Sequence, residues 1–390
     1  MKILYIANSR IPSNKAHANQ ILKMCEKFSQ QNVNVTLILP TRKNPSFKKV
    51  DPFEYHKIKK VFELKKIWSF DPTWLMKLPQ GIYIKFQLLF FIKSLILYLF
   101  FLKNRSQYIF YTRDEYLLPI LQLFSKRVVW EGHSLPRRKN RYISIFKKCY
   151  RISVLTNNLK SMLVDLGISQ KKILVSPDAV ELEIFGISMD KDKARKEMNL
   201  PEDKIILGYT GTYKTKNMDK GIRDTLKAMQ VLKKEYPSLF LVCIGGSPED
   251  IEYYNNMAKD LDLSDQVMLL GKVDQKILAI YNQAFDISMM PFPKTRHFAY
   301  FMSPLKLFEY MAAGRPIIAT DLPSERDVLN EGNAVIVKPD DPQDLSQGIK
   351  KLIDQPEFGQ KIASQSLIDV KQYTWHKRVE KIIEFLYETS

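Results

Sequence analysis

A segment in the last quarter of the chain combines an expected anion-binding helix start with a nearby carboxylate. Residues 303–324 read SPLKLFEYMAAGRPIIATDLPS, in which Ser303 is predicted to cap a helix that Gly314 ends. The unpaired amides of the first turn and the charge of Lys306 would attract an anion. Glu309 follows three residues later, on about the same face. Phosphates at the amides and ribose hydroxyls at the carboxylate suit a nucleotide, although the same pattern also fits an ordinary amphipathic helix.

Polar side chains in the first part of the chain follow predicted strands. VVWEGHSLP (128–136) places Glu131 and His133 at the end of one strand, and Arg113 closes another. His17 opens the first predicted helix. The carboxyl ends of parallel strands are where ligand groups belong, so we expect these side chains near a substrate. A histidine in such a place can equally be a structural hydrogen-bonding residue, and both interpretations stay open.

Short apolar runs rich in β-branched residues alternate with helical lengths along the whole chain. The predicted helices include residues 17–31 and about 220–236. Predicted strands cover residues 2–8, 33–39, 108–113, 127–132, 152–156 and 172–177, and then 204–211, 239–246, 266–271, 286–292, 315–321 and 333–339. Alternation of this kind predicts parallel sheets with helices on both faces. We therefore expect an α/β protein with two Rossmann-like doubly wound domains facing each other across a cleft.

The strand–helix pattern restarts after a charged connector near residue 190, and this places the domain boundaries. We predict an N-terminal domain over 1–188 and a C-terminal domain over 189–370. The remaining residues, 371–390, contain the helical sequence WHKRVEKIIEFLYE, which we expect to pack back toward the N-terminal domain. A chain of 390 residues is long enough for two domains of this size.

The positive charge of the chain is confined to its first part. The net charge is +18, but residues 1–150 carry 28 lysines and arginines against 8 aspartates and glutamates, and the rest carries 32 against 34. The first part is therefore expected to meet an anionic partner, either a phospholipid surface, a nucleic acid or a phosphorylated substrate. No recognised nucleic-acid-binding module accompanies the charge, so nucleic acid is not predicted as a partner.

One stretch, GIYIKFQLLFFIKSLILYLFFLK (81–103), is apolar enough to raise the question of a membrane. Lys85 and Lys93 interrupt it, and the longest run between charges, 94–102, is about half of the roughly 20 residues that a span needs. A buried helix, a helix lying in the membrane interface and a true span all stay open. The apolar run at residues 3–7 is too short for an export signal, so a cytoplasmic location is expected.

Several classes of protein are disfavoured by missing motifs. No GxGxxG follows a predicted strand, and no Walker A sequence is present. The three cysteines and five histidines show no zinc spacing. Two Asp-x-Asp matches, 190–192 and 260–262, lie in charged helical or linker segments. We therefore expect no metal and no cofactor.

The sequence of residues 303–316 resembles the nucleotide-sugar-binding signature of GT-B glycosyltransferases, specifically the retaining family 4. The resemblance rests on Pro304, Lys306, Glu309, Tyr310, Ala312, Gly314 and Pro316. GYTGTY (208–213) followed by Lys220-Gly221 looks like the start of that family's C-terminal domain, and CIGGSPED (243–250) looks like its second strand. SPDAVELEIF (176–185) resembles the segment before its interdomain linker.

The resemblance implies transfer of a sugar from a UDP- or GDP-sugar, with retained configuration, to a lipid-linked or polysaccharide acceptor of bacterial surface polysaccharide or glycolipid synthesis. It implies that the protein works as a peripheral enzyme on the anionic inner face of the cell membrane. The implied catalytic residues are His133, Glu309 and Lys220. The implied donor-binding residues are Gly211, Thr212, Lys216, Lys220, Ser303, Pro304, Leu305, Lys306 and Glu309, and the acceptor- or sugar-proximal residues are His17, Arg113, Glu131 and His133.

Three departures from the family pattern stand out. Phe301 occupies the position of the first of the two signature glutamates. Thr212 stands where an arginine usually follows Gly211, so Lys214 or Lys216 is expected to replace it. SRIPSNKAHANQ (9–20) stands where the family has a glycine-rich turn. These departures leave open a non-catalytic relative that binds sugar nucleotide or partner enzymes, as well as a sugar-nucleotide epimerase on the same fold.

Overall fold

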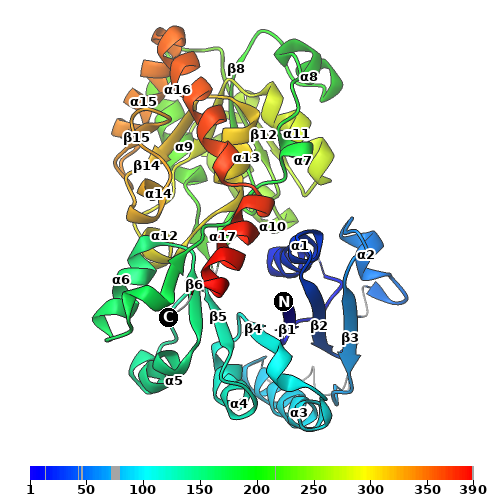
Figure 1. The fold of residues 1–390 in the computed structure, drawn as a ribbon. Coiled ribbons are helices and arrows are strands. Elements are labelled where there is room, and N and C mark those ends of the chain that lie inside the picture. Colours follow the sequence, from blue (N-terminus) through cyan, green and yellow to red (C-terminus); the bar gives the residue numbers. More distant parts are fainter. Residues whose placement is uncertain (14, 43, 45–46, 72–79, 216, 389–390) are drawn as a thin grey trace. The chain divides into compact units, whose positions relative to one another are not determined.

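The computed structural model describes the chain except for residues 14, 43, 45–46, 72–79, 216 and 389–390. It divides into unit 1, residues 1–176 and 375–390, and unit 2, residues 177–374 (Figure 1). The predicted boundary after residue 188 is therefore wrong, and the chain passes into unit 2 after Ser176. The reason is packing: Phe185 belongs to a core cluster of unit 2, and Val180 pairs with Thr374 in a parallel bridge.

Unit 1 is built on a seven-stranded parallel sheet with the order β3-β2-β1-β4-β5-β6-β7. Six of its strands confirm predicted ones, while β3 was missed because its sequence, ELKKI, is mostly exposed and carries two lysines at a sheet edge. The strands are β1 (Lys2–Ile6), β2 (Asn34–Pro40), β3 (Glu63–Ile67), β4 (Tyr108–Thr112), β5 (Val128–Gly132), β6 (Arg151–Val154) and β7 (Ile173–Val175).

Helices connect and cover the strands of unit 1. The last helix of the chain contacts α1, and the Gln31 side chain donates a hydrogen bond to the His376 carbonyl at 2.8 Å. The helices are α1 (Ala16–Gln30), α2 (Pro52–Tyr55), α3 (Gln80–Phe101), α4 (Leu118–Phe124), α5 (Ile143–Lys148), α6 (Asn157–Asp165) and α17 (Trp375–Tyr387).

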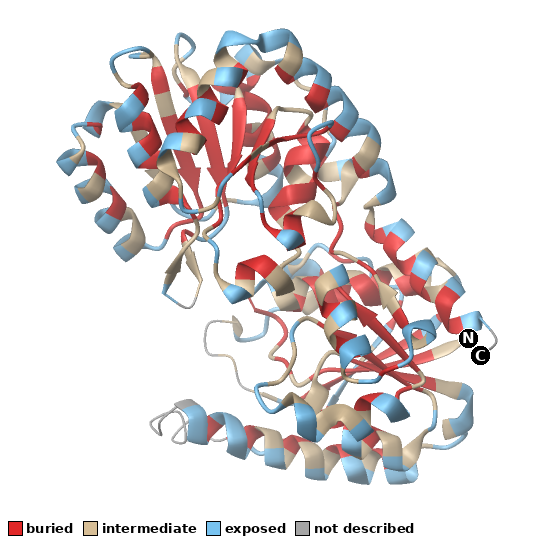
Figure 2. Cartoon of the chain, turned by 90° about the vertical axis from the view of Figure 1, so that its left-hand side faces the viewer, coloured by how far each residue is buried: buried red, intermediate tan, exposed pale blue. Residues whose placement is uncertain are grey.

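The interpretation of residues 81–103 as a buried helix is wrong. Helix α3 buries one row of side chains spaced four residues apart, and its other positions are exposed or half-buried (Figure 2). Its length and composition would allow it to cross a membrane, a test that core helices of soluble proteins also pass. The buried row consists of Tyr83, Gln87, Phe91, Leu95 and Leu99.

Unit 2 repeats the architecture with a six-stranded parallel sheet in the order β12-β11-β8-β13-β14-β15. All six strands were predicted. They are β8 (Ile205–Thr210), β11 (Leu239–Ile244), β12 (Val267–Leu270), β13 (Ile287–Met290), β14 (Ile317–Thr320) and β15 (Val335–Val337). A short antiparallel pair, β9 (Lys214–Thr215) with β10 (Met218–Asp219), was not predicted.

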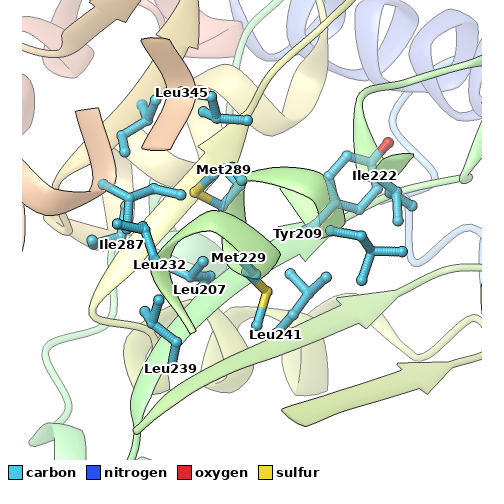
Figure 3. Packing of buried hydrophobic residues seen from close by; sticks show 14 of the residues in the cluster. Leu207, Tyr209, Ile222, Met229, Leu232, Leu239, Leu241, Ile287, Met289 and Leu345 are labelled. Atoms are coloured by element: carbon cyan, nitrogen blue, oxygen red, sulfur yellow. The ribbon is translucent and has the colours of Figure 1, made fainter. Parts of the chain in front are cut away.

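The helices of unit 2 pack on both faces of this sheet. Figure 3 shows one of the cores, where Met229 and Leu232 of α9 meet Leu207 of β8 and Leu241 of β11. The helices are α7 (Leu182–Phe185), α8 (Lys191–Glu197), α9 (Ile222–Leu232), α10 (Pro248–Asp260), α11 (Gln275–Ala284), α12 (Arg296–Phe301), α13 (Leu305–Ala313), α14 (Pro323–Arg326), α15 (Pro342–Asp354) and α16 (Pro356–Asp369).

Both sheets are doubly wound, as predicted. In unit 1, β1 lies between β2 and β4; in unit 2, β8 lies between β11 and β13. The chain reverses its direction of winding beside each of these central strands. Ligands of open α/β sheets bind beyond the carboxyl ends of the strands at such switch points. The ends of β1, β4 and β5 in unit 1, and of β8 in unit 2, are therefore the places to look for a site.

Candidate functional site

Helix α13 is fastened to the end of β8 by the tyrosine that follows Glu309. The Thr210 backbone N–H donates to the Tyr310 hydroxyl oxygen at 2.7 Å, and the two hydroxyls lie 3.1 Å apart. Gly314 ends the helix with φ 64°, as predicted. The tyrosine thus holds the helix against the switch-point strand of unit 2.

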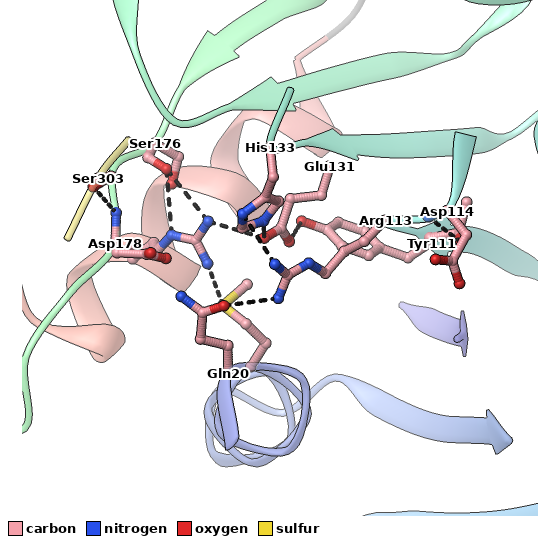
Figure 4. Close-up of polar contacts among 12 residues, drawn as sticks. Gln20, Tyr111, Arg113, Asp114, Glu131, His133, Ser176, Asp178 and Ser303 are labelled. Carbon is pink, nitrogen blue, oxygen red and sulfur yellow. Dashed lines mark hydrogen bonds and ion pairs between the residues drawn. The ribbon is translucent and has the colours of Figure 1, made fainter. Parts of the chain in front are cut away.

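Ser303 does not cap α13, which corrects the prediction. The helix begins at Leu305 with Pro304 in the N-cap position, and no described side chain caps it. The Ser303 hydroxyl instead accepts the backbone N–H of Asp178 at 2.8 Å (Figure 4). The Leu307 N–H donates to the Pro304 carbonyl at 3.0 Å, so the N–H groups of Leu305 and Lys306 are the first-turn donors that a ligand could use.

Lys306 was expected to add its charge to the start of this helix, and its side chain is buried there. Its ammonium nitrogen lies 3.4 Å from the centroid of the Tyr209 ring and 5.0 Å from that of Phe292. It finds no hydrogen-bond partner among the described residues. Burial, followed by the charge of Lys220, lowers the pKa of Lys306 well below its ordinary value. A buried ammonium without a counter-ion is costly, and an anionic ligand would compensate that cost.

Lys220 reaches the same strand end from the start of α9. Its ammonium donates to the Thr212 hydroxyl at 2.8 Å, and burial lowers its pKa to about 8. The next residue must be glycine, because a Cβ on Gly221 would lie 1.8 Å from the Pro291 carbonyl oxygen. Gly211 needs its φ of 104°, and a Cβ there would lie 4.0 Å from the Lys306 ammonium nitrogen. Gly211, Thr212, Lys220 and Lys306 therefore lie together.

Glu309 provides the carboxylate of this group. Burial raises its pKa to about 7, and the charge of Lys306 opposes that rise. Two ammonium groups, uncapped amides and a carboxylate thus surround the end of β8. This combination can hold a diphosphate at the cations and hydroxyl groups at the carboxylate.

Lys214 or Lys216 was expected to replace the arginine that is missing after Gly211. Lys214 lies 3.4 Å from the Asp250 carboxylate, and its ammonium is 4.0 Å from the centroid of the Tyr253 ring. It is therefore occupied elsewhere, which corrects that prediction. Lys216 lies outside the described residues. Lys306 is the lysine that the structure places with Lys220.

In unit 1, the predicted residues form a closed polar network centred on Glu131 (Figure 4). Its carboxylate accepts hydrogen bonds from the Tyr111 hydroxyl at 2.5 Å, from His133 Nε2 at 2.8 Å and from Arg378 Nη2 at 3.1 Å. The residue is 1% exposed, and although burial by itself would raise its pKa, Arg378 and His133 hold that pKa well below the usual range. Three donors of unit 1 thus hold the Glu131 carboxylate, and its expected place near the acceptor or sugar stays a prediction.

His133 is held in one neutral form. Because a carboxylate only accepts, Nε2 carries the proton toward Glu131, and Nδ1 accepts from the Arg113 guanidinium at 2.9 Å. Burial and the charge of Arg113 lower its pKa to about 4. The other arm of Arg113 donates to the Gln20 side chain at 3.0 Å. Both ring nitrogens of His133 are thus already bonded within unit 1.

His17 lies in the first turn of α1, at the helix start where it was predicted, and it is half-buried. Its Nε2 is 3.0 Å from the Ser9 hydroxyl, and burial together with Arg113 lowers its pKa to about 4. Sequence reasoning missed Arg378, which joins α17 to the network. Arg378 occupies a buried position in the helix pattern of Trp375, Val379 and Ile382, and a charge in such a row was the available signal.

The described residues contain no group of three or more histidine, cysteine, aspartate or glutamate side chains that could hold a metal ion. Cys25, Cys149 and Cys243 are buried free thiols.

A comparison with known families matches most of unit 2. A family model described as "Glycosyl transferases group 1" matches residues 190–367. The matched region, a little under half of the chain, is similar to that family. It contains Lys220, Lys306 and Glu309, and the two doubly wound sheets of the chain are those of the GT-B fold.

Individual relatives are distant. An uncharacterized glycosyltransferase of Haemophilus influenzae is 26% identical over 68% of this chain and 70% of its own length. The putative teichuronic acid biosynthesis glycosyltransferase TuaH of Bacillus subtilis is 27% identical over 49% of this chain and 45% of its own. The chain spans about half the length of most curated relatives that it matches.

Solved structures resemble the whole chain. The crystal structure of Anabaena HepE in complex with UDP and glucose superposes with a TM-score of 0.72 and 15% identity, covering 99% of both chains. At this identity the likeness concerns the fold.

Proposed function

We propose that the protein is a retaining glycosyltransferase of family 4, which transfers a sugar from a UDP- or GDP-sugar to a lipid-linked or polysaccharide acceptor. The observation that carries the proposal is the buried Lys306 ammonium, which makes no hydrogen bond or ion pair among the described residues and lies with Lys220 at the end of β8. The similarity to group 1 glycosyltransferases and the complex of HepE with UDP support a nucleotide-sugar donor.

Donor binding follows from the charges around β8. Lys220, Lys306 and the first-turn amides of α13 hold the diphosphate, and Glu309 accepts the ribose hydroxyls. Negative charge grows on the diphosphate as the bond to the sugar breaks. Fixed positive groups therefore stabilise the transition state more than the ground state. No protein nucleophile is needed, because the leaving phosphate accepts the proton of the acceptor hydroxyl, and neither a metal nor a cofactor takes part.

The acceptor is assigned to unit 1. His133 directly follows β5 with 24% of its side chain exposed, Arg113 directly follows β4, and His17 lies at the start of α1. His133 acts there as a neutral positioning residue, since both of its ring nitrogens are engaged. The basic first 150 residues would keep the enzyme at an anionic membrane on the cytoplasmic side, where a lipid-linked acceptor of surface polysaccharide synthesis is found.

A second candidate is a relative that binds sugar nucleotide without transferring the sugar. Phe301, the last residue of α12, offers no carboxylate at the position of the first signature glutamate, and this observation favours it. The two candidates share the donor site and differ in turnover.

The test is thermal stability with UDP, GDP and ADP, followed by turnover. Ligand at about 100 times its dissociation constant stabilises the native state by about 2.7 kcal/mol. Lys220→Ala and Glu309→Ala should each lose that stabilisation and reduce turnover by about tenfold or more. Lys227→Ala on α9 and Glu357→Ala on α16, both exposed, serve as matched controls.

The results of these measurements distinguish the two candidates and test the assignment of the donor site. If no nucleotide stabilises the protein, or if both site variants respond like the wild type, the donor site is misassigned. Stabilisation by one nucleotide without turnover of its sugars would favour the second candidate.

A further inference from the structure

Helix α3 presents a broad apolar face to solvent. Its large apolar side chains outside the buried row include Leu97 at 61%, Phe100 at 65% and Phe101 at 71% exposure. They continue toward the helix start, where Ile82, Ile84, Phe86 and Leu89 are also exposed. An apolar patch of this extent on a folded unit indicates a surface that meets another apolar phase.

The end of β3 extends the same patch. Trp68, directly after β3, is 68% exposed, and a groove of about 480 Å³ lies between this segment and α3. Its lining includes Trp68, Leu97 and Phe101, together with Lys65 and Lys103. We refer to Trp68, Leu89, Leu97, Phe100 and Phe101 as the α3–β3 surface.

The α3–β3 surface is firmly attached to unit 1. Tyr83 and Gln87, in the first turns of α3, donate hydrogen bonds to the buried Asp71 carboxylate at 2.8 and 2.7 Å. Arg10, from the segment after β1, lies 3.2 Å from the same carboxylate. Further along, α3 contacts α4 and β3. The helix therefore lies against the domain with its exposed face outward and cannot at the same time cross a bilayer.

The charges along α3 and the residues directly after it are all positive. From residue 80 to residue 107 the chain has no aspartate or glutamate, and its charged residues are Lys85, Lys93, Lys103 and Arg105. Lys85 and Lys93 lie exposed on α3 beside the apolar side chains. Apolar side chains flanked by lysines match the acyl and phosphate layers of an anionic bilayer.

We propose that the α3–β3 surface inserts into an anionic phospholipid bilayer, with the apolar side chains among the acyl chains and the lysines at the lipid phosphates. Attraction of the basic unit to a charged surface is long-ranged and weakened by salt, whereas burial of Leu97, Phe100 and Phe101 persists in salt. Membrane binding should therefore include an apolar contribution from Leu97, Phe100 and Phe101 that salt does not remove. This inference does not depend on the donor site of unit 2.

The experiment uses the full chain and vesicles of phosphatidylcholine with about one third phosphatidylglycerol, sedimented at low and at raised salt. Leu97→Asp/Phe101→Asp should lower the partition coefficient about tenfold or more at both salt concentrations. The matched control, Val231→Asp/Ile368→Asp, carries the same change at exposed apolar positions of unit 2 and should bind like the wild type. All four side chains are exposed, so melting temperatures should change little.

A second measurement locates the insertion. In a Trp74→Phe background, which removes the tryptophan that lies outside the described residues, bromine-labelled acyl chains should quench tryptophan fluorescence. Adding Trp68→Phe should remove that quenching, because Trp130 and Trp375 are buried. Three results would each overturn the proposal: binding that raised salt abolishes completely, equal binding of the Leu97→Asp/Phe101→Asp variant, or a dimer in solution that the same variant dissociates.

Discussion

Each unit contains a buried cluster of charged side chains, and the two clusters are satisfied differently. In unit 1, three donors within 3.1 Å surround the Glu131 carboxylate, one of them the Arg378 guanidinium. In unit 2, the Lys306 ammonium meets aromatic rings, and no described residue bonds to it. The first cluster is complete within its own unit, whereas in the second the Lys306 ammonium has no hydrogen-bonded partner among the described residues.

This difference separates a structural site from a binding site. A buried charge is tolerated when it is paired and hydrogen-bonded, and leaving one unpaired costs several kcal/mol. The pairing of Glu131 fastens α17 to the strands of unit 1. The Lys306 ammonium has no such partner, so an anionic ligand that bound to it would recover free energy that its burial costs. Both clusters contain residues that the sequence marked as functional, and only the contacts distinguish them.

The largest effect is expected from breaking the complete cluster. Arg378→Met removes the guanidinium and leaves the buried Glu131 without its cation, so we expect a loss of about 3–5 kcal/mol in the free energy of unfolding, measured by urea denaturation. Arg378→Lys should recover part of it. A loss below about 1 kcal/mol would show that Glu131 does not depend on this partner.

The corresponding substitution in unit 2 should not lower the free energy of unfolding. Lys306→Met replaces an unpaired buried charge by an apolar chain of similar length, so the free energy of unfolding should stay equal or rise by about 1 kcal/mol. Affinity for the stabilising nucleotide should fall about tenfold, measured by calorimetric titration. A clear loss of stability together with unchanged affinity would mean that Lys306 has a structural role and that the contrast between the clusters is false.

The smallest expected effect is a pH dependence of nucleotide binding at the lysines of unit 2. Burial holds the pKa of Lys220 at about 8 and that of Lys306 well below its ordinary value. A bound diphosphate favours their charged forms, so binding at about pH 8 should take up protons, and affinity should fall severalfold by about pH 9. Titrations in buffers of different ionisation enthalpy measure the uptake.

Lys220→Met should flatten the alkaline fall in affinity, and Lys227→Met, at an exposed position of α9, should not. Binding without proton uptake in the wild type would place the diphosphate away from these lysines.

Much of the fold could be predicted because strand and helix periodicity are local. The twelve predicted strands are all present, and β3 was missed because an exposed edge strand such as ELKKI carries no apolar run. The boundary was placed too late because packing joins residues 177–188 to unit 2. Packing also decides the role of Ser303. Its position before a predicted helix is typical of an N-cap, but its hydroxyl accepts the N–H of Asp178.

The sequence by itself determined the two parallel sheets, the segment 303–314 as a site and the concentration of positive charge before residue 150, because periodicity, turn residues and composition are written along the chain. Only the tertiary structure decided which charges are paired. It pairs Glu131 with Arg378, nearly 250 positions away, and Lys214 with Asp250. It leaves the Lys306 ammonium without a hydrogen bond or ion pair among the described residues. Pairing in a buried site depends on distances between elements remote in sequence, and no local pattern records them.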